Sequence, residues 1–255
     1  MFERSAAELR LTDLGGRIVQ QAKRVLAESV RLEEIAAENN DPLKGVLRIG
    51  VIYTVAPYLL PQLVPALHRR APGMPLYLKE DFTENLLPAL KGGDLDVLIL
   101  ALPVVMSGVV AQALYDERFR VLVPVDHAWK LPVSSKELAG DQMLILGQGN
   151  CFRDQVLEAC PQLSAAAGLE KSVEGGSLET LRFMVASGAG VAIMPSTAAD
   201  PLVGRESMVR VLPFKDPQPS RRIGLVWRIS FPRVQALDVV KAAVLDCALP
   251  GTTKL

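Results

Sequence analysis

Two cysteines nine residues apart carry the clearest chemistry in this sequence. Between Cys151 and Cys160, residues Phe152, Val156 and Ala159 follow helical spacing until Pro161 ends the pattern. Nine residues of intact helix correspond to about 13.5 Å of rise, whereas a disulfide needs Cα atoms within roughly 7 Å of each other. The two thiols can therefore bond only if the helix unwinds, so the pattern predicts a switch driven by oxidation.

Cys151 is placed by this pattern in the first turn of its helix. Backbone N–H groups and the helix dipole stabilise a thiolate there, and Arg153 adds a positive charge nearby. A peroxide oxidises a thiolate to a sulfenic acid, which condenses with a second thiol such as Cys160. The alternative is a pair of buried structural cysteines. Cys247 lies beside Val244 on the apolar face of the last predicted helix and is expected in the core.

Other chemistries have little support. The two histidines, His68 and His127, are far from each other and from the cysteines, so neither a zinc site nor a Ser-His-Asp triad can be assembled, and no metal or cofactor is expected. Thr54 and Thr83 each follow a predicted strand. Each is either a helix cap or a ligand contact at the carboxyl end of a sheet.

Composition limits the class of protein. The chain has 255 residues, 49% of them hydrophobic, and a formal net charge of zero, which does not suggest a basic nucleic-acid-binding surface. Three cysteines do not make a secreted disulfide framework. The first residues lack the apolar core of a signal peptide, and no apolar run is long enough to span a bilayer. A cytoplasmic location without membrane contact is expected.

The elements alternate in two α/β units. Strands are predicted at 46–52, 76–80 and 97–102 with helices at 58–70 and 84–91. The second unit has strands at 143–146, 172–174 and 191–194, the cysteine helix and a helix at 178–187, followed by strands at 209–214 and 223–227 and a helix at 234–248. Extended linkers near 103–118 and 214–222 are expected to join two lobes around a cleft.

A long amphipathic helix precedes these units. Thr12 is a plausible N-cap, and charges occupy the face opposite an apolar stripe with heptad-like spacing, formed by Ile18, Ala22, Val25, Ser29, Leu32 and Ala36. The stripe predicts self-association, because 39–42 (Asn-Asn-Asp-Pro) separates the helix from the first α/β unit. The alternative is a surface helix packed on its own domain.

Several segments resemble the LysR-type transcriptional regulators, over essentially the whole chain. Residues 2–5 with Leu11, Thr12 and Gly15 are similar to the end of that family's winged helix-turn-helix and the start of its linker helix. Residues 45–50, 177–188 and 190–195 are typical of its effector domain. Residues 53–61, residues 151–155 and a second cysteine at Cys160 are more specific, and they resemble the family's hydrogen-peroxide sensors.

The resemblance implies an α/β fold with two Rossmann-like subdomains, like a periplasmic binding protein, after a long dimerisation helix. It divides the chain into 1–11 (remnant of the helix-turn-helix), 12–40 (linker helix), 45–102 with 220–249 (regulatory subdomain I) and 119–214 (regulatory subdomain II with the redox cysteines). Cys151 would react with peroxide and then pair with Cys160. Peroxide-pocket residues would be Thr54, Thr83, Asn150 and Arg221, supported by Arg153 and Asp154.

The same resemblance implies a non-enzymatic regulator of antioxidant genes. Its partners would be its own copies in a homodimer or homotetramer, hydrogen peroxide, promoter DNA with RNA polymerase, and glutathione and glutaredoxin as reductants. This chain departs from the family in two respects. Asn150 stands where the family usually has His, and Asn cannot act as a base. Residues 1–11 correspond to only part of the wing, so no specific DNA binding is expected of this chain alone.

Three other interpretations stay open. The first is a LysR-type effector domain that senses a small organic ligand, with incidental cysteines. The second is a thiol peroxidase, although 145–150 lack the Pro and Thr usual before a peroxidase cysteine. The third is a solute-binding protein of the same two-lobed shape.

Overall fold

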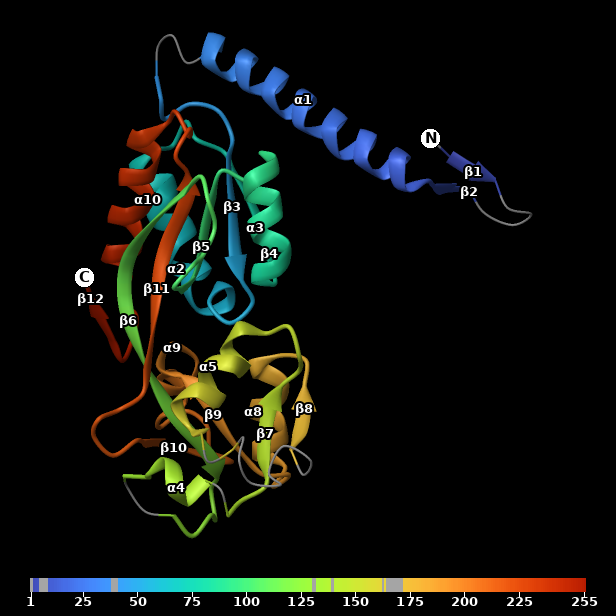
Figure 1. Ribbon diagram of the computed structural model, residues 1–255. Coiled ribbons are helices and arrows are strands. Elements are labelled where there is room, and N and C mark those ends of the chain that lie inside the picture. Colours follow the sequence, from blue (N-terminus) through green and yellow to red (C-terminus); the bar gives the residue numbers. More distant parts are fainter. Residues whose placement is uncertain are drawn as a thin grey trace.

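One mixed β-sheet runs through both halves of the part of the chain that the computed structural model describes, which is residues 2–4, 9–37, 41–129, 132–138, 140–161, 163 and 172–255. The strand order is β4-β3-β5-β11-β6-β9-β7-β8, and β10 and β12 each pair with β6. Figure 1 shows two lobes stacked end to end, with a long helix projecting from the upper lobe. The fold is thus α/β, as the sequence predicts.

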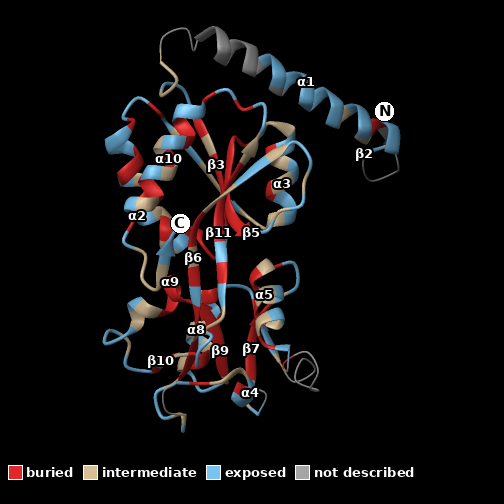
Figure 2. Ribbon diagram, turned by 60° about the vertical axis from the view of Figure 1, so that its left-hand side comes forward, coloured by how far each residue is buried: buried red, intermediate tan, exposed pale blue. Residues whose placement is uncertain are grey.

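Lobe I has three parallel strands, β3 (Leu47–Ile52), β4 (Leu76–Asp81) and β5 (Val97–Leu102). Helices α2 (Ala56–Arg70), α3 (Thr83–Gly92) and α10 (Val234–Asp246) cover them. The apolar runs of β3 and β5 are almost wholly buried, as expected for parallel strands with helices on both faces (Figure 2). Gly93 ends α3 in the left-handed region with φ +86°, a backbone conformation that glycine adopts without strain.

Lobe II repeats the arrangement with β7 (Met143–Leu146), β8 (Val173–Gly175) and β9 (Val191–Pro195) in parallel, and β10 (Val209–Pro213) at the edge of β6. The helices bounded within the described part of this lobe are α4 (Ser135–Leu138), α5 (Cys151–Ala159), α8 (Leu178–Ala186) and α9 (Ser196–Ala199), and the 3₁₀ turn η1 (Asp200–Leu202) follows α9. Its buried apolar side chains form a cluster separate from that of lobe I.

Two long antiparallel strands connect the lobes. β6 (Val109–Pro124) and β11 (Ser220–Arg228) pair along most of their length, and β12 (Thr252–Lys254) joins the other edge of β6. The extended segments expected near 103–118 and 214–222 do connect the lobes, and their residues 109–118 and 220–222 belong to these paired strands. We call β6 and β11 the hinge strands. β6 continues into lobe II, where it pairs with β9, and β11 pairs with β5 in lobe I.

The N-terminal part consists of the hairpin β1 (Phe2–Arg4) and β2 (Leu9–Leu11) and the helix α1 (Asp13–Ala37). The predicted cap is confirmed, because the Thr12 Oγ1 accepts a hydrogen bond of 2.9 Å from the Gly15 N–H. Ile18 and Val25 of the predicted stripe are 42% and 61% exposed. The side chains of Leu32 and Ala36 lie outside the described residues.

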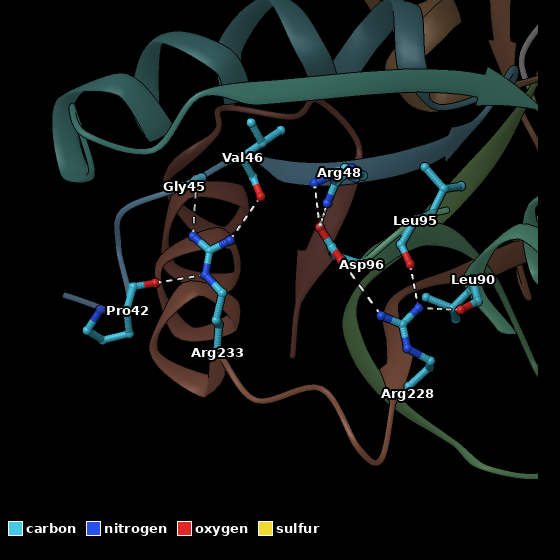
Figure 3. A network of polar contacts seen from close by, with 9 residues as sticks. All are labelled: Pro42, Gly45, Val46, Arg48, Leu90, Leu95, Asp96, Arg228 and Arg233. Carbon is cyan, nitrogen blue, oxygen red and sulfur yellow. Dashed lines mark hydrogen bonds and ion pairs between the residues drawn. The ribbon is translucent and has the colours of Figure 1, made fainter. Parts of the chain in front are cut away.

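Arginines secure the end of lobe I that faces α1 (Figure 3). The buried Arg233 donates hydrogen bonds to the carbonyls of Pro42, Gly45 and Val46, in the segment between α1 and β3. Arg228 donates to the carbonyls of Leu90 and Leu95 (Figure 3). The contacts of Arg233 attach the entering chain to the start of α10. Those of Arg228 attach the end of β11 to α3 and to the segment just before β5.

Candidate functional site

Cys151 begins α5 at the end of lobe II that faces lobe I (Figures 1 and 2). Its side chain is partly buried and packs against the apolar cluster of lobe I, whereas the next residue, Phe152, is buried in the cluster of lobe II. The thiol therefore lies between the lobes, at the N-terminus of α5.

Cys160 follows the last residue of α5, and its N–H still donates to the Val156 carbonyl at 2.9 Å. All three cysteines are free thiols. Because α5 is continuous from Cys151 to Ala159, the helix keeps the sulfurs apart, as the spacing predicts. Burial in lobe II raises the pKa of the Cys160 thiol to about 11, so this thiol stays protonated at neutral pH. Cys247 is buried in lobe I, as predicted, and donates to the Ala243 carbonyl.

Arg221 links the lobes beside the cysteine helix. Its Nη1 donates to Thr54 Oγ1 at 2.7 Å and its Nη2 to the Thr54 carbonyl at 3.0 Å, across the turn between β3 and α2. The guanidinium carbon lies 4.9 Å from the centre of the Phe152 ring, a cation–π contact with α5. Thr54 and Arg221 are both buried. The structure thus brings Thr54 and Arg221 together next to the residue that follows Cys151.

The two threonines are not helix caps, so that alternative is wrong for both. The cap of α2 is Val55, without a side-chain hydrogen bond, and the Thr54 hydroxyl is bound to Arg221. Thr83 is the first residue of α3, after Phe82, and within the described residues its buried hydroxyl has no hydrogen-bond partner. The neighbouring Glu84 lies close to Gly149, in the loop before Cys151. Thr83 therefore belongs to the same region between the lobes.

Asn150 supplies the cap that starts α5. Its Oδ1 accepts a hydrogen bond of 3.1 Å from the Phe152 N–H, and the side chain is buried. Arg153 turns away from the thiol, because its Nη1 donates to the Leu146 carbonyl and to Glu174 at 2.8 and 2.6 Å. Asp154 is exposed in the first turn, where a negative charge suits the helix dipole. Arg153 and Asp154 thus support the helix from the side of lobe II.

Glu117 is the principal site residue that sequence reasoning missed. It is paired in register with Arg221 across the hinge strands, and its Oε2 accepts from the Arg221 Nε at 2.7 Å. Its Oε1 accepts from the backbone N–H of Thr197, at 3.2 Å, and from the Thr197 hydroxyl. A signal did exist: Tyr115, Phe119 and Val121 alternate with polar residues, and Glu117 occupies the apolar phase of that strand.

A second contact across the lobes was also missed. The Tyr58 hydroxyl on α2 donates to Glu179 on α8 at 3.1 Å, and Tyr58 packs against the cluster of lobe II. Burial and the adjacent negative charge of Glu179 raise the pKa of Tyr58 well above its ordinary value. The hydroxyl stays protonated and can serve as the donor at any physiological pH.

Neither a metal centre nor a membrane helix is present among the described residues. They contain no group of three or more His, Cys, Asp or Glu side chains that could hold a metal ion. Among the helices described, none combines the length and apolar character that crossing a membrane requires.

Comparison with known proteins places this geometry in a family. The LysR substrate binding domain matches residues 40–246. A probable hydrogen peroxide-inducible genes activator of Streptomyces viridosporus is 37% identical, covering 96% of this chain and 79% of the relative. The DNA-binding transcriptional dual regulator OxyR of Escherichia coli (strain K12) is 38% identical, with 91% and 76% covered.

Comparison with solved structures indicates the same family. A full-length OxyR variant from Pseudomonas aeruginosa superposes with a TM-score of 0.78 at 43% identity, covering 97% of this chain and 83% of that one. The likeness extends over both lobes and includes the periplasmic-binding-protein-like fold. This chain therefore belongs to the LysR-type transcriptional regulators and, within them, resembles the OxyR group in sequence and fold.

Proposed function

We propose that this chain is the redox-sensing part of a transcription regulator, oxidised by hydrogen peroxide at Cys151 and locked by a Cys151–Cys160 disulfide. One observation carries the proposal. A single helix presents one thiol at its N-terminus between the lobes and holds the other in the core of lobe II. The names of the relatives support the choice of peroxide as the oxidant.

The chemistry has two balanced steps. The Cys151 thiolate attacks one peroxide oxygen, so that an S–O bond forms, the O–O bond breaks and hydroxide leaves, to be protonated to water. The sulfur is oxidised to the sulfenic acid and the peroxide is reduced. The Cys160 sulfur then attacks the Cys151 sulfur, and the sulfenic oxygen leaves as water with the Cys160 proton. Two cellular thiols return the two electrons by exchange.

The residues around Cys151 would bind peroxide and stabilise its leaving oxygen. The three hydrogen bonds of Arg221 to described residues use three of its five N–H groups, and the remaining groups can donate to an oxygen that gains negative charge. Thr54 and Thr83 contribute hydroxyls. Asn150 contributes the helix cap and no acid–base group, so the helix terminus and Arg221 would supply the activation.

The proposal extends to the domains and partners. Residues 45–102 with 220–249 and residues 119–214 would be the two regulatory subdomains. They would follow a linker helix at 12–40 and a segment at 1–11 that resembles the end of the family's helix-turn-helix. The exposed apolar residues of α1 would pair with a second copy, in a dimer or tetramer. Since LysR-type regulators are not an enzyme family, the oxidation would be a signal and not a turnover reaction. The protein would work in the cytoplasm, with glutathione and glutaredoxin as reductants.

A crosslinking experiment tests the central step. Treating the reduced chain with peroxide should join Cys151 to Cys160, seen by mass spectrometry as one linked peptide pair. The Cys160→Ser variant should stop at the Cys151 sulfenic acid, trapped by a dimedone probe. Cys247→Ser is the matched control and should form the crosslink normally. A reduced Cys151 after peroxide treatment, or a crosslink that involves Cys247, would reject the proposal.

A further inference from the structure

A buried carboxylate lies behind the guanidinium of the candidate site. Glu117 is 0% exposed, and it pairs with β11 only two residues before β6 begins to pair with β9 of lobe II. It binds the Nε edge of Arg221, and the opposite side of the guanidinium holds Thr54. The carboxylate and Thr54 together leave the guanidinium little rotational freedom.

The carboxylate itself is held from lobe II. Its second oxygen accepts both the backbone N–H and the hydroxyl of Thr197, on the buried helix α9. A chain of hydrogen bonds thus runs from α9 through Glu117 and Arg221 to Thr54 in lobe I. Each member is buried, so every bond acts in a medium that screens charge weakly.

We propose, resting on the function above, that Glu117 is a positioning residue. It orients the two N–H groups of Arg221 that bind no described residue toward peroxide bound at Cys151. Thr197 contributes by holding the Glu117 carboxylate in place through its two hydrogen bonds. Peroxide has only two heavy atoms, so its recognition depends on the direction of very few hydrogen bonds.

Stability alone does not account for this pair. A buried ion pair can be replaced by apolar residues of similar volume with little loss of stability, and often with a gain. The positions around Glu117 on the same face of β6 are apolar, and an apolar pair would suit them. The ion pair instead fixes the orientation of the Arg221 guanidinium, because this planar group is held by Glu117 on one side and by Thr54 on another. A misplacement of about 1 Å can cost about 10²-fold in rate.

The experiment compares two reactions of the same thiol. Rate constants for Cys151 are measured with two reagents. Hydrogen peroxide would accept hydrogen bonds from Arg221, whereas iodoacetamide would not need them. Glu117→Asp keeps the charge and shortens the side chain by one methylene, drawing the guanidinium back. We expect the peroxide rate constant to fall about tenfold while alkylation stays within about twofold.

A second, milder variant tests the same role in case Glu117→Asp does not fold. Thr197→Val removes the hydroxyl that holds the Glu117 carboxylate but keeps the volume and the charge pair. We expect a smaller fall in the peroxide rate, about threefold, again without a change in alkylation. Asp116→Asn is the matched control, because Asp116 binds Arg222 one position along the same two strands, at the surface. It should leave both rates unchanged.

The outcomes separate this inference from the proposed function. A wild-type Cys151 that reacts with peroxide no faster than free cysteine would reject the proposed function. If the wild-type rate is high, wild-type peroxide rates in both Glu117→Asp and Thr197→Val would overturn the positioning role. An equal fall in peroxide reaction and alkylation would also overturn it, because it would indicate a change of access to the thiol. So would an Asp116→Asn variant as slow as Glu117→Asp.

Discussion

The two cysteines at the ends of α5 differ in environment. Cys151 lies at the helix N-terminus and contacts the apolar cluster of lobe I, whereas Cys160 is buried among apolar neighbours in lobe II. Burial alone raises the pKa of Cys160, since the thiolate would lose its hydration. We therefore expect the oxidant to react with Cys151 first, and Cys160 to react only in the second step.

This asymmetry predicts a pH dependence of stability. Since the folded pKa of Cys160 is raised from 9.0 to about 11, the folded chain keeps a proton that the unfolded chain releases above pH 9. The contribution is complete below pH 9 and is lost as the pH rises toward 11. Between pH 8 and 10.5 it amounts to about 2 kcal/mol of unfolding free energy.

Urea unfolding at the two pH values measures this contribution. Cys247→Ser should lose about 2 kcal/mol more than the double variant Cys160→Ser/Cys247→Ser, in which no buried cysteine titrates. Equal losses in the two chains would mean that the Cys160 thiolate is accommodated in the folded state.

Residue spacing could predict part of the site. Cys151 and Cys160 were predictable because they lie at the two ends of one local helix, and Thr54 and Thr83 because each follows a strand. Arg221 came only from the family resemblance, and its partner Glu117 was not predicted. The two are 104 residues apart in sequence, and only strand pairing brings them together. A local pattern can mark Glu117 as unusual in its strand, but it cannot name the partner.

At the scale of elements, α5 is a short helix that must be undone for the disulfide to form. Phe152 and Val156 are buried in lobe II, and exposing each would cost about 1.5–3 kcal/mol. This cost has to be met by the redox free energy, for which about 30 mV corresponds to 1.4 kcal/mol. The disulfide should therefore be comparatively oxidising and readily reduced.

Hydrogen exchange tests the unwinding. Amide exchange in α5 should increase strongly after peroxide treatment of the native chain and much less in Cys160→Ser. Helix α8 is the internal control, since it also has nine residues in the same lobe and carries no cysteine. If α5 stays as protected as α8 while the crosslink is present, the unwinding mechanism is wrong.

The elements themselves are predicted closely where their signal is local. The helix and strand bounds of both lobes agree to within one or two residues for most elements, because apolar periodicity, Asn or Ser caps and glycine ends lie in the same segment. The sequence predicts a linker where the first half of the hinge strand β6 lies. Residues 109–113 are exposed or only partly buried there, and their pairing partner is β11, about a hundred residues later.

At the scale of the whole molecule, α1 projects from lobe I (Figure 1), and its residues Ile18 and Val25 are exposed. Self-association through Ile18 and Val25 would remove them from water. The double variant Ile18→Asp/Val25→Asp should weaken association at least tenfold, because it would bury charges in the seam. Gln20→Asp, on the opposite face of the helix, should not.

Sedimentation velocity over a range of micromolar concentrations measures the association of the three chains. A native chain that remains monomeric throughout, or a Gln20→Asp variant that dissociates as readily as the double variant, would show that this stripe is not the contact between copies.

The three paired strands β11, β6 and β12 limit which source of free energy can change the conformation of this molecule. At Glu117, β6 pairs with β11 on one side and β12 on the other, so bending the molecule there would break backbone ladders on both edges. A ligand of two heavy atoms offers at most about 1.5 kcal/mol of binding free energy per atom, which is too little to drive such bending. A small oxidant can therefore change this scaffold only by reacting with it. Reduction of its O–O bond supplies the free energy, and that free energy unwinds one short helix, α5.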